Sequence, residues 1–193
     1  KLTHVLYVAK VDSFYKIFEI PKKSGGTRKI CAPTGDLKQI QEKLYSILLH
    51  HQQFLRKQNN IHANISHAFE KGKSIITNGE VHRNKRIVIN IDLQDFFDSF
   101  HFGRVCGFFE KNRDFALPHE LAIVMAQLTC YQGKLPQGAP TSPIITNYIC
   151  QIFDMRILKI AKKYHLDYTR YADDLSFSTN DKKFISQWEP FYN

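Results

Sequence analysis

The hydrophobic positions of the chain recur at helical spacing in several segments. In residues 36–57 an apolar residue appears every three or four positions, which predicts an amphipathic helix. Residues 117–130 predict a core helix and residues 74–78 the start of another. A further helix is expected from Ser142 onward, with Ser142 as its N-cap and Pro143 at its first position. The apolar stripe of residues 117–130 consists of Leu121, Val124, Met125 and Leu128.

Strand-like segments lie between these helices. Residues 14–20 and 28–32 predict a hairpin that is closed by the turn Ser24-Gly25-Gly26. Residues 64–69 are typical of a loop, and residues 131–135 are typical of a short extended segment. Helices and strands mixed in this order indicate an α+β fold.

Three aspartates stand at the ends of apolar, strand-like segments. The β-branched run 88–92 predicts a buried strand that ends in Asp92. The run Tyr171-Ala172-Asp173-Asp174 lies between two further apolar segments, so we expect Asp173 and Asp174 at the tip of a hairpin. An Asp pair by itself is more often a solvated turn, and the combination with Asp92 is what indicates a site.

Adjacent carboxylates such as Asp173 and Asp174 are unfavourable unless a cation lies between them. A two-metal phosphoryl-transfer site needs carboxylates from separate segments, because one ion activates the attacking hydroxyl while the other stabilises the leaving pyrophosphate. In such a site Asp92 and Asp173 would be bridging ligands and Asp174 the third ligand. Ligands that are all oxygen favour two Mg²⁺ ions, and Mn²⁺ fits the same set.

These aspartates belong to a series of motifs that resembles the palm of reverse transcriptases. Residues 18–30 are similar to the fingers segment of the bacterial retron-type group. One segment departs from that group, because Asn78-Gly79-Glu80-Val81-His82 carries Gly where retron enzymes carry Ala. Group II intron-type, CRISPR-associated and unclassified phage-defence reverse transcriptases therefore stay open as alternatives. The palm motifs are Asp92 with Phe97, Leu135-Pro136-Gln137-Gly138 and Tyr171-Ala172-Asp173-Asp174.

The resemblance implies a right-hand polymerase with fingers at residues 1–86 and palm at residues 87–193, its thumb absent or not represented. It implies RNA-directed DNA synthesis from deoxynucleoside triphosphates, starting at a 3′-hydroxyl, or at a 2′-hydroxyl if priming is of the retron type. A structured noncoding RNA would be template and primer, with DNA as product, an effector protein as a partner and anti-phage defence as the role. Alternatives are an RNA-binding module without catalysis and an untemplated polymerase.

The resemblance also implies which residues hold the incoming nucleotide. Lys22, Lys23 and Arg28 would contact its triphosphate, although without the resemblance they would be a basic surface hairpin. Phe97 would lie beneath the sugar and exclude a 2′-hydroxyl, which favours deoxynucleotides. Phe96 is expected in the core.

Further site residues follow from the same motifs. Gln137 offers an amide to the nucleotide or template, and Gly138 permits a close approach that a Cβ would block. Tyr171 and the small Ala172 would contact the primer, and Leu93 would join the aspartates as a metal ligand.

Composition agrees with a polyanionic partner. The 193 residues contain 27 Lys and Arg against 18 Asp and Glu, a formal net charge of +9. Arg170 is expected to be a surface charge.

No apolar run approaches the roughly 20 residues that span a bilayer, so no membrane partner is expected. Four cysteines without C-x-x-C spacing indicate reduced thiols in the cytoplasm: Cys31, Cys106, Cys130 and Cys150.

Overall fold

The computed structural model describes residues 2–8, 10–22, 25–58, 65–182 and 184. The chain divides into two compact units, each made of two stretches of sequence. The first unit contains Lys1–Ile61 and Asp95–Ile149, and the second contains His62–Gln94 and Cys150–Asn193. Stretches of the two units alternate along the sequence. This partition differs from the prediction, which places a single boundary between residues 86 and 87. The assignment of fingers and palm to 1–86 and 87–193 stays a prediction.

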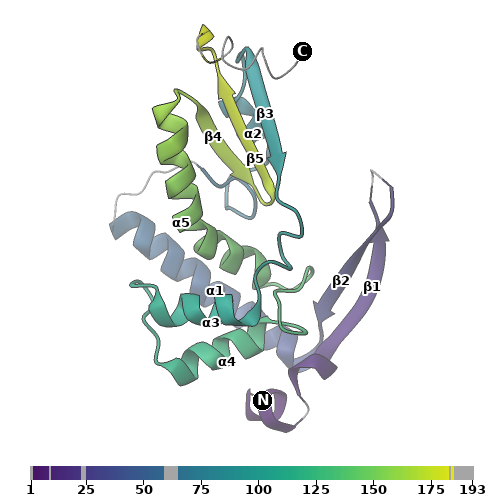
Figure 1. Ribbon diagram of the computed structural model, residues 1–193. Coiled ribbons are helices and arrows are strands. Elements are labelled where there is room, and N and C mark those ends of the chain that lie inside the picture. The colour runs from purple at the N-terminus through teal and green to yellow at the C-terminus, as the bar shows by residue number, and fades with distance from the viewer. Residues whose placement is uncertain (1, 9, 23–24, 59–64, 183, 185–193) are drawn as a thin grey trace. The chain divides into compact units, whose positions relative to one another are not determined.

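The first unit begins with two short helices and a two-stranded antiparallel sheet (Figure 1). The short helices are η1 (His4–Val8) and η2 (Val11–Phe14). Strands β1 (Tyr15–Pro21) and β2 (Thr27–Pro33) form the predicted hairpin, and Pro21 is paired with Thr27 at its closed end. In its turn, Gly25 and Gly26 have φ of 90° and 78°, a region in which glycine pays no steric penalty.

The first unit also contains three whole helices, α1 (Gly35–Gln58), α3 (Phe102–Lys111) and α4 (His119–Thr129), and the start of α5 (Ser142–Lys163). The predicted helices 36–57 and 117–130 are thereby confirmed. One core cluster forms where Val5, Leu37 and Leu128 meet.

The apolar stripe predicted for α4 is partly wrong. Leu121 is 52% exposed, whereas Ala122 and Ala126 are fully buried. Helices α3 and α4 pack against each other, and the small alanine side chains allow close approach. A prediction from hydrophobicity alone gives more weight to the larger side chains than to alanine. The predicted buried face of α4 is therefore rotated about the helix axis relative to the observed one.

Two local predictions near the start of α5 (Ser142–Lys163) are also corrected. Residues 131–135 form a tight turn, because Tyr131 pairs with Lys134 and the two residues between them have φ of 48° and 78°. Ser142 lies inside the helix, and its hydroxyl is buried with no hydrogen-bond partner, so it does not cap the helix. The partition of the two units falls within α5.

The second unit contains a three-stranded antiparallel sheet with the order β3-β5-β4 (Figure 1). The strands are β3 (Ile87–Asp92), β4 (Asp167–Tyr171) and β5 (Asp174–Thr179). Helix α2 (Ile75–Val81) begins where the sequence predicts, with a capping box in which the Ser74 hydroxyl accepts from the amide of Thr77. The core of this unit is formed by Ile65, Ala161, Tyr168 and Leu175.

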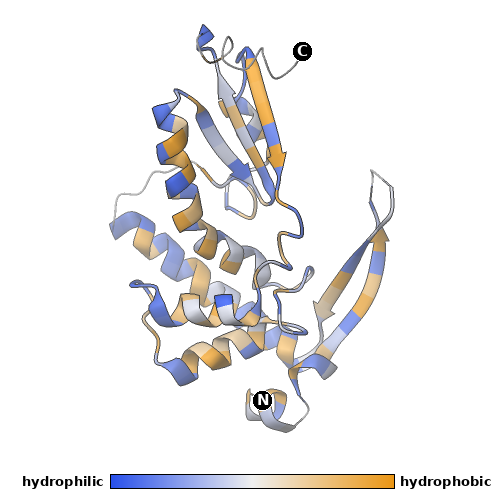
Figure 2. Ribbon diagram, in the orientation of Figure 1, coloured by the Kyte–Doolittle hydropathy of each residue, from blue (hydrophilic) through white to orange (hydrophobic). Residues whose placement is uncertain are grey.

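Strand β3 is not buried as the sequence predicts. Val88 and Ile91 are each 48% exposed, although the strand is among the most apolar segments of the chain (Figure 2). β3 is the edge strand of the described sheet and has β5 as its one strand neighbour. An apolar run shows that a strand is favourable, but it does not show how many neighbours cover it.

Two further observations concern the cysteines and the helices. All four cysteines are free and buried. Among the described residues, no helix is both long enough and apolar enough to cross a membrane.

Candidate active site

The register of the second unit's sheet brings the three aspartates to one end of it. Asp92, the last residue of β3, is paired with Asp174, the first residue of β5. Directly opposite residues of an antiparallel pair project from the same face of the sheet, with Cβ atoms roughly 5 Å apart. The amide of Leu93 donates to the carbonyl of Asp173 at 3.0 Å, which attaches the end of β3 to the hairpin tip.

The hairpin between β4 and β5 has a two-residue loop. Tyr171 pairs with Asp174, so Ala172 and Asp173 form the loop. Ala172 has φ of 58°, a left-handed conformation that is uncommon for a residue with a side chain. Asp92 and Asp174 are exposed, whereas Asp173 is half-buried and Ala172 is buried. The carboxylates are therefore open to ions and substrate, while the backbone beneath them is enclosed.

The three carboxylates influence one another electrostatically. Partial burial, followed by the negative charges of Asp173 and Asp92, raises the pKa of Asp174 above its ordinary value. A divalent cation between these groups would relieve the repulsion. The donor set consists of carboxylate oxygens, to which Leu93 can add only its backbone carbonyl. This set fits a hard cation such as Mg²⁺.

Arg170 is the clearest error of the sequence prediction, because it is fully buried rather than a surface charge. Its guanidinium forms a bidentate ion pair with Asp154 of α5, with Nε to Oδ1 and Nη2 to Oδ2 both at 2.8 Å. Its Nη1 donates to the carbonyl of Ala172 at 3.0 Å. Burial opposes the charge of Arg170, but hydrogen bonding and attraction to Asp154 outweigh it and raise the pKa of Arg170.

The backbone of Arg170 is held by a segment that sequence patterns assign to a loop. The amide of Arg170 donates to the carbonyl of Ile65 at 2.8 Å, and the amide of His67 donates to the carbonyl of Arg170 at 2.9 Å. Ser66 and Arg170 thereby form a parallel bridge. Strand β4 consequently has hydrogen-bonded neighbours on both sides.

His82 is a second buried group whose role the sequence did not show. Its Nδ1 lies 2.7 Å from the hydroxyl of Ser178 on β5, and its Nε2 lies 2.7 Å from the hydroxyl of Thr169 on β4. Burial is the first cause that lowers the pKa of His82. The motif 78–82 marked this residue as notable, but its partners lie about 90 positions further along the chain.

In the first unit, Gln137 and Gly138 lie against β2. The amide of Cys31 donates to the carbonyl of Gln137 at 2.7 Å. Gly138 has φ of 109°, and a Cβ at this position would lie 2.6 Å from Cγ2 of Ile30. Gly138 thus approaches β2 closely. The roles of Gln137 and Gly138 in binding nucleotide or template stay predictions.

The predicted triphosphate contacts are on the β1–β2 hairpin of the first unit. Lys22 and Arg28 are exposed there, and Lys23 lies outside the described residues. Phe97 is half-buried, with its ring edge-to-face to that of Phe96 at a centroid distance of 5.4 Å. Phe96 is 5% exposed, which confirms its core position. The contacts of Lys22, Arg28 and Phe97 with nucleotide stay predictions.

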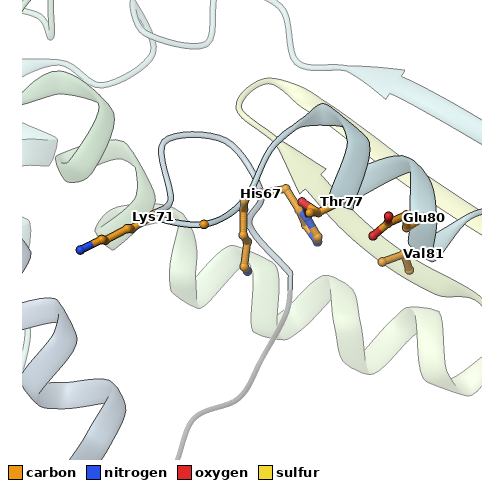
Figure 3. Close-up of a pocket in the computed structure, with 7 residues that line it drawn as sticks. His67, Lys71, Thr77, Glu80 and Val81 are labelled. Carbon is orange, nitrogen blue, oxygen red and sulfur yellow. Dashed lines mark hydrogen bonds between the residues drawn. The ribbon is translucent and has the colours of Figure 1, made fainter.

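A cavity of about 520 Å³ in the second unit contains none of the predicted site residues (Figure 3). At its wall, Nδ1 of His67 lies 2.8 Å from the hydroxyl of Thr77. Lys71 points away from the side chains of α2 in the same view. The polar groups do not converge on one point, so we assign the cavity no part in the chemistry. It is lined by His67, Lys71, Gly72, Lys73, Thr77, Glu80 and Val81.

Another group in the first unit has the composition of a metal site. Ligand atoms of Cys106, Glu110 and His119 all lie within 4.8 Å of one another, the one such group of three among the described residues. Nδ1 of His119 lies 3.4 Å from Oε2 of Glu110, and this direct contact accounts for their proximity. The ligand atoms of Asp92, Asp173 and Asp174 do not form such a group.

A family model described as "Reverse transcriptase (RNA-dependent DNA polymerase)" matches residues 20–187 of the chain. The chain therefore belongs to the reverse transcriptase family.

Within this family, similar proteins include retron enzymes. The chain is 34% identical to the reverse transcriptase of retron Mx162 from Myxococcus xanthus, over 95% of the chain and 40% of that protein. It is also 34% identical to the reverse transcriptase of retron Ec86 from Escherichia coli, over 96% of the chain and 55% of that protein. The chain spans about half the length of these relatives.

Solved structures of telomerase share the fold. The chain matches telomerase from Candida albicans with a TM-score of 0.61 and 13% identity, over 92% of the chain and 39% of the other. It matches apo telomerase from Candida tropicalis with a TM-score of 0.59 and 16% identity, over 96% and 47%. These matches confirm the predicted α+β fold of a right-hand polymerase, in its fingers and palm portion.

Proposed function

We propose that this protein is an RNA-directed DNA polymerase of the retron type, which adds deoxynucleotides to a primer hydroxyl by two-metal nucleotidyl transfer. The observation that supports it most directly is the pairing of Asp92 with Asp174, with the amide of Leu93 bonded to the carbonyl of Asp173. This register gathers carboxylates from two separate segments, as two-metal transfer requires. The family and the retron relatives supply the reaction type.

In this proposal each residue at the hairpin tip has a distinct task. Asp92 and Asp173 would hold two Mg²⁺ ions, with Mn²⁺ as a substitute, and Asp174 and the carbonyl of Leu93 would complete the ligand set. When bound, the ions would lower the pKa of the attacking hydroxyl and stabilise the negative charge of the leaving pyrophosphate. Ala172 leaves room for the primer end because it is small, and Tyr171 contacts the primer.

The nucleotide-binding residues are proposed from the first unit. Lys22, Lys23 and Arg28 bind the triphosphate, for which the bidentate geometry of an arginine is well suited. Phe97 beneath the sugar excludes a 2′-hydroxyl, and Gln137 holds the nucleotide or the template through its amide. The exposed positions of Lys22 and Arg28 leave their charges available for such contacts.

The similarity to retron enzymes suggests the substrate and the biological role that we propose. A structured noncoding RNA serves as template and primer, DNA is the product, and the enzyme acts in the cytoplasm with an effector protein in anti-phage defence. The net charge of +9 supports binding to a polyanion. The defence role and the effector are inferred from the retron likeness alone.

Primer extension tests the proposal. The protein, expressed at its natural length, is given an RNA template, a primer, Mg²⁺ and each type of nucleotide separately, with Asp173→Asn as the inactive control. Template-dependent extension with deoxynucleotides that the substitution abolishes is the expected result. Absence of extension, with RNA binding that the substitution leaves unchanged, would show an RNA-binding module instead.

A further inference from the structure

We infer that Arg170 and Asp154 are positioning residues, which fix the peptide between Ala172 and Asp173 so that the carboxylates can share metal ions. This inference rests on the proposed function and adds a support to its site. In this proposal neither side chain binds a metal ion or contacts the substrate. Both lie in the second unit with the three aspartates.

The contacts of Arg170 run from helix α5 to the tip of the hairpin. Two of its guanidinium nitrogens engage both carboxylate oxygens of Asp154, each at 2.8 Å. A third, Nη1, reaches the carbonyl of Ala172 at 3.0 Å. The hydroxyl of Tyr168 donates to Oδ1 of Asp154 at 2.9 Å, so the acid is oriented by two residues of β4. Arg170 is 0% exposed and Asp154 is 4% exposed, so water does not compete for these bonds.

A buried ion pair is a costly way to stabilise a core. Apolar side chains of similar volume often stabilise as well or better, because they carry no desolvation penalty. An apolar residue at 170, however, cannot donate a hydrogen bond to the carbonyl of Ala172. The geometry therefore points to a specific use of the guanidinium at the hairpin tip.

The carbonyl of Ala172 belongs to the peptide that leads into Asp173. Ala172 holds a left-handed φ of 58°, which persists only where neighbouring contacts enforce it. On the far side of this peptide, the carbonyl of Asp173 accepts from the amide of Leu93, directly after Asp92. Without the donor at 170, the 172–173 peptide is free to rotate, and Asp173 moves relative to Asp92. Asp174 stays in place because the sheet register holds it.

The backbone of Arg170 is anchored independently of its side chain. Its amide and carbonyl are bonded to Ile65 and His67, on the edge of β4 that faces away from β5. A substitution of the side chain therefore leaves β4 in its sheet. The effect of such a substitution is expected at the tip, rather than along the strand.

The test compares a paired apolar replacement with a neighbouring control. In Arg170→Met with Asp154→Leu, both charges are removed together, so no unpaired charge is left buried. The control is Thr169→Val, which removes a buried hydrogen bond to His82 from the adjacent residue of β4. Mn²⁺ binding is followed by electron paramagnetic resonance, primer extension is titrated with Mg²⁺, and thermal unfolding is recorded, all on the protein at its natural length.

The positioning role predicts a double variant that unfolds below the wild-type temperature, because the hydroxyl of Tyr168 and the carbonyl of Ala172 lose buried partners. It should also bind Mn²⁺ about tenfold more weakly, because one ligand is no longer oriented. Its Mg²⁺ requirement for extension rises by a similar factor. Thr169→Val is expected to unfold at a lower temperature while keeping wild-type Mn²⁺ affinity. A double variant with wild-type Mn²⁺ affinity and Mg²⁺ requirement would overturn the inference, and so would an equal loss of affinity in Thr169→Val.

A failure of the proposed function looks different. If Asp173→Asn binds Mn²⁺ as tightly as the wild type, the aspartates are not the metal site, and the proposed function and the positioning role both fail. If Asp173→Asn loses Mn²⁺ while the double variant keeps it, the metal site stands and the positioning role alone is refuted. Arg170→Lys adds a graded variant, since it keeps the charge but loses the planar fork and is expected to bind Mn²⁺ with intermediate affinity.

Discussion

The two hairpins of the molecule are built in opposite ways. The β1–β2 hairpin is a two-stranded sheet whose first strand has no buried residue. The β4–β5 hairpin has a third strand beside β5, the 65–67 segment beside β4, and mostly buried residues along both strands. The first carries the proposed triphosphate contacts, and the second carries the two adjacent aspartates.

The difference shows where the protein needs rigidity. An isolated two-stranded hairpin is marginally stable in water, so β1–β2 depends on a few contacts, such as that between Cys31 and Gln137. In the proposed function, this hairpin adapts to the nucleotide as it arrives. Carboxylates that stabilise a transition state must be oriented beforehand, and in the proposed function the enclosed β4–β5 hairpin would provide that orientation. Four predictions test this difference between the two hairpins.

The largest effect is expected at the β4–β5 hairpin, which carries the proposed metal ligands. Asp173→Asn should lower the rate of primer extension on the order of 10³-fold, as expected when a preorganised charge is lost. The matched control is Glu19→Gln, which neutralises an exposed acid on β1 and should leave the rate unchanged. Single-turnover extension measures both variants. Equal losses in the two would mean that the aspartate acts only through net charge.

The second prediction concerns the support of the β1–β2 hairpin. Gly138→Ala combines a strained positive φ with a Cβ only 2.6 Å from Ile30. It should lower the free energy of unfolding by about 2–4 kcal/mol, measured by urea denaturation.

A second glycine provides the control for this measurement. Gly107 lies in α3, where an added Cβ would have no neighbour within 4 Å. Gly107→Ala should therefore raise stability by about 0.5–1 kcal/mol through helix propensity. If both substitutions destabilise equally, the close approach at Gly138 is not what matters.

The third prediction separates binding from stability on the exposed hairpin. Arg28→Ala should raise the KM for deoxynucleotides by about tenfold, since a charge-assisted contact to phosphate is lost. Its melting temperature should stay at the wild-type value because the side chain is exposed. Lys29→Ala removes an equal charge from the opposite face of β2 and should leave KM unchanged. A KM effect at Lys29 as large as that at Arg28 would indicate a diffuse electrostatic field instead.

The smallest effect is a pH dependence of stability in the absence of metal. The folded pKa of Asp174 is raised above its ordinary value, chiefly by partial burial and then by Asp173 and Asp92. Its ionisation therefore costs the folded state more than the unfolded state, and stability falls as pH rises from the ordinary value through the raised one. Asp174→Asn should melt at a higher temperature than the wild type at pH 7 with a chelator present.

The same comparison has an internal check. Below the ordinary pKa of an aspartate, the melting temperatures of Asp174→Asn and the wild type should converge, because both side chains are then neutral. Saturating Mg²⁺ should favour the wild type, since the ion binds the folded state. A difference that is constant with pH would exclude Asp174 as its source.

Local sequence signals predicted the elements well. The helix at 36–57, the capped start of α2 and both hairpins depend on spacing, caps and turns within a few residues. The aspartates could be located for the same reason, because each follows a strand-like run.

Features that depend on distant partners could not be predicted. Arg170 is buried because Asp154, on another element, compensates its charge, and neither residue is unusual in its own neighbourhood. His82 likewise depends on hydroxyls of two strands far along the chain. The exposure of β3 depends on its place at the edge of the sheet, which hydrophobic pattern does not encode.

The glycine at position 138 restricts how this sequence can change over generations. Two separate conditions require it. The backbone φ is 109°, and an added Cβ would lie only 2.6 Å from Cγ2 of Ile30. A smaller residue at position 30 would remove the second condition but not the first. A change at position 30 therefore cannot compensate fully for the loss of glycine at position 138. Related sequences are expected to vary at position 30 while position 138 stays glycine.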